Sequence, residues 1–171
     1  MSYAIVYDSR TGNTEALARA VAAALPSEGR LAFGRVDEVD RAAVAQAARV
    51  YAGFWTNRGD CGDELAEVLA SLADKDAFLF GTAGFGADET YFAGVMARVA
   101  VHLPESARIV GTFMCQGRMP ASVRARYAQT AEAKPEQAAR MHQLIENFDE
   151  AASHPDDDDL ARLREAVQAA S

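Results

Sequence analysis

The chain contains five apolar segments with the length and composition of β-strands. Four of them are nearly continuous runs: residues Tyr3–Tyr7, 50–55, 77–80 and 109–114. Continuous runs are typical of parallel strands that are covered on both faces. The remaining segment, second along the chain, differs because Leu31, Phe33 and Val36 alternate with other residues. We therefore expect this second strand at an edge of the sheet.

Helical patterns fill the stretches between the strands. The clearest stripes have apolar residues three or four positions apart and are centred on Leu17, Leu69 and Val95. Pro104 follows the third stripe and ends it. A shorter helix is predicted over residues 42–48. The simplest role for these stripes is to face the core.

The alternation of strands and helices predicts the α/β class. Parallel strands joined by right-handed crossovers give a doubly wound sheet with helices on both faces, which makes three layers. Five parallel strands suit the order 2-1-3-4-5, which places the second strand at an edge. In such a sheet a ligand binds outside the carboxyl ends of the strands, where the strand order reverses. A binding site is therefore expected in the loops after strands one, three and four.

Composition and charge narrow the function classes. The formal net charge of −8 disfavours a nucleic-acid partner, which clustered Lys and Arg would bind. This charge is compatible with a basic protein partner and equally with simple solubility. No apolar run approaches the roughly 20 residues that insert into a membrane. The first strand begins too early for a signal peptide, so a cytoplasmic location is expected.

The sequence does not indicate metal or thiol chemistry. The two cysteines, Cys61 and Cys115, lie in no CxxC or Cys/His cluster. His102, His142 and His154 are scattered and lack the spacing of metal ligands. We expect free thiols in a reducing compartment and no metal site.

A polar loop follows the first strand and leads directly into a helix. Its residues are Ser9, Arg10, Thr11, Gly12, Asn13 and Thr14. Hydroxyls, an amide and backbone N–H groups would converge there on a helix N-terminus, whose partial positive charge suits a phosphate. Gly12 lets the backbone curl closely around the anion. An ordinary N-cap would explain one such residue but not the whole run, so the loop is predicted to bind phosphate.

Ser-x-Thr-Gly-Asn-Thr after an N-terminal strand resembles the FMN phosphate loop of the flavodoxin family. The resemblance extends over residues 1–115 in the spacing of strands, helices and loops. It implies FMN as cofactor and a single domain over residues 1–171, with a core of residues 1–118 and additional C-terminal helices over 119–171. It also implies redox partner proteins, a reductase and an acceptor. The oligomeric state stays open.

The second loop comprises Trp55, Thr56, Asn57, Arg58, Gly59 and Asp60. By the resemblance, Gly59-Asp60 matches a Gly-Asp peptide that lies beside the flavin N5 and whose glycine carbonyl can turn toward it. The alternative for Gly59 is a plain turn at a helix entry. The chain departs from the family pattern because Asn57 or Arg58 stands where an aromatic residue is common. Trp55 either covers the flavin ring or fills the core.

The third loop spans residues 81–89 and includes Thr82, Ala83, Gly84, Phe85 and Gly86. Its glycines let the backbone pass close to a flat ligand, and Phe85 is the side chain expected to cover that ligand. The loop begins like the dinucleotide motif GxGxxG, but Glu89 replaces the third glycine. A dinucleotide fingerprint is therefore not expected.

The segment after the fifth strand is longer than one closing helix requires. One apolar stripe contains Met141 and Phe148, and another contains Leu163 and Val167. Residues 156–159 are four aspartates that suit a helix start rather than a calcium loop. The extra helices are expected either to pack back on the domain or to shape a partner surface. Residues 115–118 either contact the flavin or form a simple turn.

Two functions remain open at this point. The first is an FMN-binding carrier that shuttles single electrons between redox partners, in which no side chain acts as a catalytic acid or base. The second is an FMN-dependent NAD(P)H:quinone or small-molecule reductase, favoured by the departures at Asn57-Arg58 and by the long tail. A phosphoryl-receiver domain is disfavoured because Trp55 stands where that class needs an aspartate.

Overall fold

The computed structural model describes residues 1–86 and 88–171. Its centre is a five-stranded sheet built from β1 (Tyr3–Tyr7), β2 (Arg30–Arg35), β3 (Arg49–Trp55), β4 (Asp76–Ala83) and β5 (Arg108–Gln116). Every pair of neighbouring strands is parallel, and the order is β2-β1-β3-β4-β5. The predicted doubly wound topology is therefore confirmed, including the edge position of the second strand.

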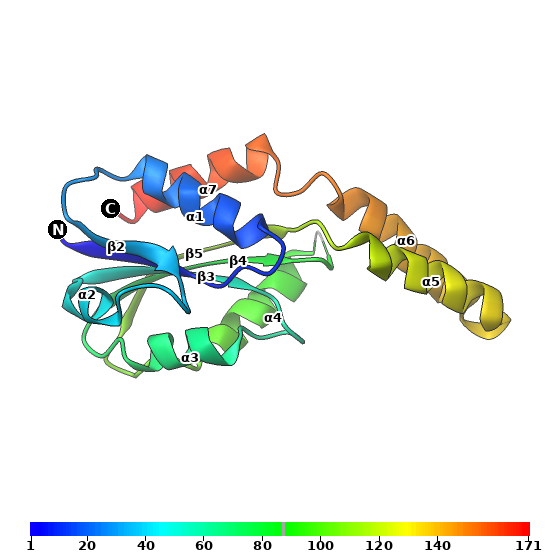
Figure 1. Ribbon diagram of the computed structural model, residues 1–171, viewed down its shortest axis with the longest axis horizontal. Coiled ribbons are helices and arrows are strands. Elements are labelled where there is room, and N and C mark those ends of the chain that lie inside the picture. The colour runs from blue at the N-terminus through cyan, green and yellow to red at the C-terminus, as the bar shows by residue number, and fades with distance from the viewer. Residues whose placement is uncertain (87) are drawn as a thin grey trace.

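Helices cover both faces of the sheet (Figure 1). On one face lie α1 (Asn13–Ala24) and α7 (Asp157–Ala169), which pack side by side. On the other face lie α2 (Arg41–Gln46), α3 (Asp63–Ala70) and α4 (Glu89–Ala100). The result is the expected three-layer arrangement.

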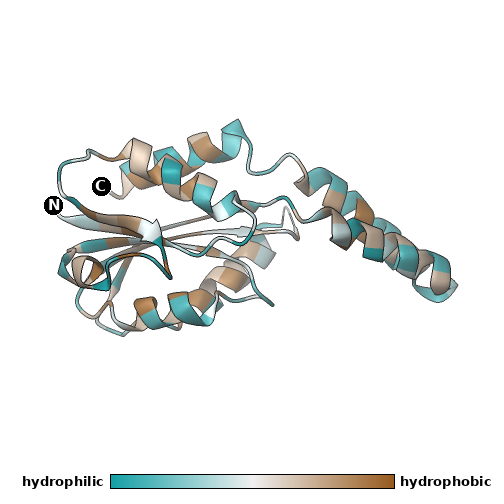
Figure 2. Cartoon of the chain, in the orientation of Figure 1, coloured by the Kyte–Doolittle hydropathy of each residue, from teal (hydrophilic) through white to brown (hydrophobic). Residues whose placement is uncertain are grey.

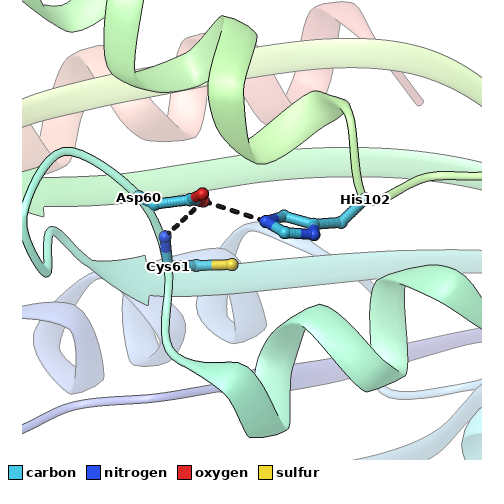
Figure 3. Close-up of side chains that lie close together, drawn as sticks. All are labelled: Asp60, Cys61 and His102. Carbon is cyan, nitrogen blue, oxygen red and sulfur yellow. Dashed lines mark hydrogen bonds and ion pairs between the residues drawn. The ribbon is translucent and has the colours of Figure 1, made fainter.

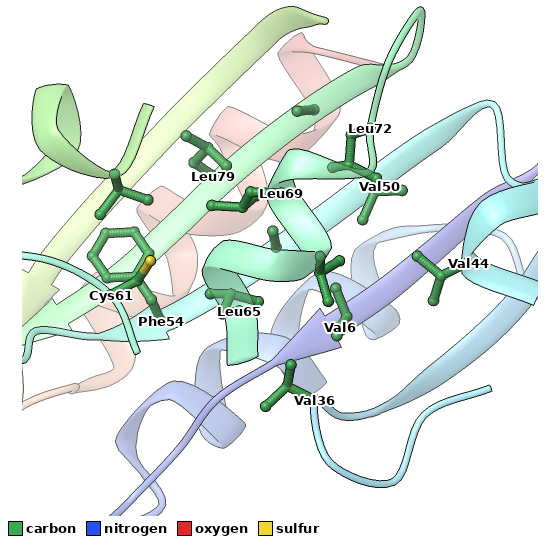
Figure 4. Packing of buried hydrophobic residues seen from close by; sticks show 14 of the residues in the cluster. Val6, Val36, Val44, Val50, Phe54, Cys61, Leu65, Leu69, Leu72 and Leu79 are labelled. Carbon is green, nitrogen blue, oxygen red and sulfur yellow. The ribbon is translucent and has the colours of Figure 1, made fainter. Parts of the chain in front are cut away.

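Side chains of the strands alternate between two apolar cores because successive residues of a strand point to opposite faces. Val6 and Phe54 pack toward α3, where Leu65, Leu69 and the thiol of Cys61 join them (Figure 4). Ile5 and Tyr51 pack toward α1 and α7, against residues such as Leu17, Val21 and Leu163. The two cores explain why β1 and β3 read as continuous apolar runs.

The fourth strand is longer than its apolar run predicts. The run ends at Phe80, but β4 continues through Gly81, Thr82 and Ala83. Gly81 packs against the ring of Phe54 so closely that a Cβ there would lie 2.5 Å from a ring carbon. The prediction missed this extension because glycine and threonine interrupt the pattern. Thr82 and Ala83 are thus strand residues rather than loop residues.

The chain after β5 forms two different structures. α5 (Ala121–Ala133), the 3₁₀ turn η1 (Pro135–Gln137) and α6 (Ala138–Ala151) make a helical hairpin that projects away from the sheet (Figure 1). We call residues 119–153 the inserted hairpin. Its two ends meet where the backbone N–H of Arg118 donates to the carbonyl O of His154 at 2.9 Å. α7 then returns to the sheet and packs against β5.

The extra helices therefore behave differently: α7 packs back on the sheet, as one of the two alternatives predicts, whereas the inserted hairpin projects away from it (Figure 1). The hairpin has polar residues over much of its surface (Figure 2), while Tyr127, Met141 and Phe148 are buried. Within the described residues, no helix has the length and apolar character needed to cross a membrane.

Candidate functional site

The loop after β1 wraps around the first turn of α1. Ser9 is buried, and its Oγ accepts hydrogen bonds from the backbone N–H groups of Gly12 and Glu15, both at 3.2 Å. Gly12 has a φ of 89°, a left-handed conformation that glycine adopts without steric strain. The loop therefore presents a well-ordered helix N-terminus, whose remaining N–H groups and partial positive charge suit an anion.

Asn13 and Thr14 connect this loop to neighbouring elements. Asn13 Nδ2 donates to Thr11 Oγ1 at 3.1 Å and to the carbonyl O of Arg118 at 2.8 Å. Asn13 Oδ1 is buried and has no hydrogen-bond partner among the described residues. Thr14 is fully buried, and its Oγ1 lies 3.2 Å from Thr82 Oγ1. Asn13 thus keeps an unused acceptor, while Thr14 ties the loop to β4.

A hollow of about 420 Å³ opens between the loops after β1, β3 and β4 and the beginning of the inserted hairpin. We call it the first hollow. The predicted residues that line it are Arg10, Thr11, Asn13, Trp55, Thr56, Thr82, Ala83, Gly84 and Phe85. The volume lies in the range of small-molecule sites. Three of the predicted loops therefore meet at one place, as the strand order requires.

A second hollow of about 390 Å³ adjoins the first. The two share Thr56, Gly84 and Phe85 as lining residues. The rest of the second hollow is formed by Arg58, Gly59, Tyr91 and Arg98. Six of the predicted site residues line neither hollow: Ser9, Gly12, Thr14, Asn57, Asp60 and Gly86. Ser9 lines only a third depression on the β2 side.

Trp55 and Phe85 are the aromatic side chains of the first hollow. Trp55 is half-buried at its rim, where its Nε1 donates to Asp8 Oδ2 at 2.9 Å. The guanidinium of Arg10 lies 5.5 Å from the centre of the Trp55 ring. Phe85 is 41% exposed, a large fraction for an aromatic side chain in a loop of this kind. Trp55 is therefore not part of the buried core, and both aromatic side chains line the first hollow.

The second loop contains a tight turn, which lies shortly before α3 begins at Asp63. Asn57 and Asp60 exchange backbone hydrogen bonds at 2.8 and 3.0 Å across it. The two central residues, Arg58 and Gly59, both have positive φ, 51° and 86°, which is the pattern of a type I′ turn. The carbonyl O of Gly59 accepts a 2.8 Å hydrogen bond from Arg98 Nε on α4. The predicted turning of this carbonyl toward a flavin would have to break that bond.

Beyond the turn, Asp60, Cys61 and His102 lie close together (Figure 3). Asp60 Oδ1 accepts from the backbone N–H of Cys61 at 2.7 Å and lies 3.0 Å from His102 Nε2. Burial, together with the charge of Asp60, raises the pKa of the Cys61 thiol to about 12. The thiol is therefore protonated at neutral pH and packs as a small apolar group, while Asp60 and His102 stabilise the loop.

The third loop is held by the inserted hairpin. Asn147 on α6 donates to the carbonyl O of Gly84 at 2.8 Å, and its Oδ1 accepts from the backbone N–H of Gly86 at 3.2 Å. Met119 packs so closely that a Cβ on Gly84 would lie 2.6 Å from its Sδ. Ala87, which belongs to the predicted loop, lies outside the described residues. Gly84 therefore admits a close neighbour from the hairpin, Met119.

The sequence pattern missed the contribution of the hairpin to the site. Gly117 and Arg118, together with Met119, Pro120, Ser122, Val123 and Arg126, line the first hollow. Of these, only Gly117 and Arg118 belonged to a segment with a predicted ligand contact. The start of α5 carries no distinctive motif, so spacing along the chain could not have placed it over the loop after β1.

Comparison with known proteins identifies the family of the chain. A family model described as "Flavodoxin domain" matches residues 4–168. A flavodoxin-like domain-containing protein BilS from Clostridium symbiosum is 37% identical over 177 residues, which cover 96% of this chain and 93% of that protein.

Solved structures share the fold. Oxidised flavodoxin 2 from Bacillus cereus has a TM-score of 0.57 at 16% identity and covers 99% of this chain and 97% of its own. The apo form of an NADH:FMN oxidoreductase has a TM-score of 0.55 at 14% identity and covers 99% of this chain and 87% of its own. From the family match and the 37% identical relative, the chain belongs to the flavodoxin family.

Proposed function

We propose that this chain binds FMN in the first hollow and carries single electrons between redox partner proteins. The observation that carries the proposal is the composition of the hollow. Hydroxyl, amide and arginine donors line it together with Trp55 and Phe85, and no carboxylate does so among the described residues. A phosphate monoester brings close to two negative charges, which such a lining accommodates.

Asn13 Oδ1, which has no hydrogen-bond partner among the described residues, supports FMN as the ligand of the first hollow. A buried oxygen without a donor costs roughly 1–3 kcal/mol, and Asn13 Oδ1 is such an oxygen. A ligand with hydroxyl groups next to its phosphate can supply the missing donor, and the ribityl chain of FMN carries such hydroxyls. Thr11 and the N-terminus of α1 would hold the phosphate, while Trp55 and Phe85 would flank the flavin ring.

The described residues that line the first hollow include no general acid or base. Its ionisable lining residues are Arg10, Arg118 and Arg126, and arginine does not release its proton in proteins. Bound FMN would itself supply the redox chemistry, and the residues of this chain would bind, orient and partly shield it. This division of labour favours a carrier over an enzyme that must move protons to a substrate.

The alternative is an FMN-dependent reductase of quinones or other small molecules. The second hollow favours it, because a space of about 390 Å³ beside the first has room for a second small molecule. Tyr91 is the lining residue there with a dissociable hydroxyl.

Stepwise anaerobic reduction of the FMN-loaded protein separates the two functions. A carrier is expected to accumulate the one-electron reduced flavin, visible in the absorption spectrum, and to oxidise NADPH negligibly. Direct two-electron reduction, with NADPH oxidation that depends on added quinone, would instead establish the reductase. The variant Tyr91→Phe serves as an internal check, because only the reductase is expected to depend on that hydroxyl.

A further inference from the structure

Five arginines surround the two hollows. Arg10, Arg118 and Arg126 line the first hollow, and Arg58 and Arg98 line the second. All five are exposed, and they come from the loop after β1, the turn after β3, α4, the connection after β5 and the inserted hairpin. We call this surface the arginine face.

The arginine face is uncompensated. None of its five guanidinium groups forms an ion pair with a described residue. No described carboxylate lines either hollow. The nearby acidic residues line a separate depression toward β2, which Arg10 and Arg35 also border: Asp8, Asp37, Asp63 and Glu64. The local charge thus has the opposite sign to the net charge of −8 of the chain.

The excess positive charge persists when a cofactor is bound. This step rests on the proposed binding of FMN, whose phosphate carries about two negative charges. Five guanidinium groups exceed that charge. The arginine face would therefore stay positive in the loaded protein, and a charged surface steers the approach of a partner of opposite sign.

We infer that the arginine face docks an acidic surface of a protein electron partner. A single small anion would engage a compact group of arginines, whereas these come from five separate segments and line two hollows. Phe85, 41% exposed, lies between the hollows and offers the kind of aromatic contact that is enriched with arginine at protein interfaces. The net charge of −8 alone suggests a basic protein partner, whereas the arginine face suggests an acidic one.

Trp55 provides a direct test, because it is the single tryptophan of the chain and lines the first hollow. The purified full-length protein is titrated with a short polyglutamate peptide and, separately, with polylysine, while tryptophan fluorescence is recorded. Polyglutamate is expected to change the Trp55 signal in a saturable, salt-sensitive way, and polylysine is not. A response to polylysine alone, or to neither peptide, would overturn the inference.

Charge reversal identifies the surface. Arg126→Glu and Arg58→Glu are expected to weaken polyglutamate binding at least fivefold, as reversal of a contact charge does when screening is low. The matched control is Arg164→Glu on α7, which also replaces an exposed helical arginine with no ion pair among the described residues. An equal loss in the control would mean that net charge, not the arginine face, governs binding.

Electron transfer gives an independent measurement. The FMN-loaded protein is reduced with dithionite and mixed with ferricyanide, an anionic one-electron acceptor. The rate constant is expected to fall as ionic strength rises from about 0.01 to 0.3 M, and this slope should flatten in Arg58→Glu but not in Arg164→Glu. A rate that rises with salt would contradict the inference.

If the rate constant falls with ionic strength but polyglutamate does not bind, the arginine face binds a small anion and not a protein partner. That result would overturn the inference. FMN binding is followed separately by visible absorbance. Failure to bind FMN would remove the proposed function, and the fluorescence titration would still decide the docking surface.

Discussion

At the scale of single residues, the site depends on polar groups with defined partners. Asn13 bridges the loop after β1 to Arg118, which directly precedes the inserted hairpin. Its Oδ1 has no hydrogen-bond partner among the described residues. Thr11 lies at the rim, exposed, with its Oγ1 accepting from Asn13. Thr14, which the sequence pattern grouped with them, is instead a buried link to Thr82. The two threonines therefore have different roles and different expected phenotypes.

Replacing Thr11 with alanine should weaken FMN binding without destabilising the fold. One hydrogen bond to a charged oxygen is worth about 1.5–3 kcal/mol, which corresponds to roughly a 10- to 150-fold higher Kd. Isothermal titration calorimetry measures the change. The control Thr112→Ala removes an exposed threonine of β5 that lines neither hollow. Unchanged affinity in Thr11→Ala would remove this residue from the phosphate site.

Asp159 links the start of α7 to the end of the inserted hairpin. It is 1% exposed and accepts from the backbone N–H of Asp156 at 3.1 Å. It also lies 2.5 Å from His154 Nδ1 and contacts Arg162. Burial alone would raise its pKa, but the hydrogen bonds from His154, Asp156 and Arg162 outweigh burial and hold the pKa below its usual value.

A lowered folded-state pKa means that Asp159 stabilises the protein above its unfolded-state pKa of about 3.9. That contribution is lost as pH falls below this value toward the lower folded-state pKa. Asp159→Asn should lower the free energy of unfolding at pH 7 by about 2–4 kcal/mol and flatten its decline below pH 4. Urea unfolding across this pH range tests both effects, with the exposed Asp158→Asn as control. Equal stability of the two variants would contradict the assignment.

At the scale of elements, the sequence predicted those whose pattern is set by burial. β1 and β3 are covered on both faces, so nearly every residue is apolar, and their prediction is confirmed. α5 was not predicted because Tyr127 is its one buried residue, and a helix that packs mainly on one partner leaves little periodic signal. A turn at Gly59 was one of the two alternatives, but the positive φ of Arg58 was not predicted, because arginine is uncommon in that conformation.

The contact between α6 and the third loop makes a second element-level prediction. Asn147→Ala removes the hydrogen bonds to Gly84 and Gly86, each worth about 1 kcal/mol, so amide hydrogen exchange at Gly86 should accelerate about fivefold or more. FMN affinity should fall as well, since Gly84 lines both hollows. Gln143→Ala, exposed one turn earlier on α6, is the control. Unaltered exchange at Gly86 would show that α6 does not hold the loop.

At the scale of the whole molecule, the extra length of this chain is an insertion rather than an extension. α7 completes the cover of the sheet beside α1, burying Leu163 and Val167. The inserted hairpin leaves and re-enters the domain at adjacent points, Arg118 and His154. The sequence predicted that the loops after β1, β3 and β4 line the site, because strand order dictates which loops meet. It did not predict the contribution of the inserted hairpin, because the path of an insertion is not set by the sheet.

Deletions can test whether α7, but not the inserted hairpin, is required for the fold. Replacing the inserted hairpin with a short glycine-rich turn between Arg118 and His154 should leave a cooperatively unfolding protein with the circular dichroism of an α/β domain. Truncation after residue 118 should instead abolish cooperative unfolding, because it uncovers the face of the sheet that Leu163 and Val167 bury. Loss of folding in the excised protein, with thermal denaturation as the readout, would show that the hairpin is part of the folding unit.

The central claim is that the loop after β1 and the first hollow bind the phosphate of FMN. The most direct test is to titrate the full-length protein with FMN and with riboflavin, which lacks only the phosphate. Two charge-assisted hydrogen bonds are worth at least about 3 kcal/mol, so FMN should bind at least about 100-fold more tightly. Equal affinity for the two flavins, or no binding of either, would contradict the claim.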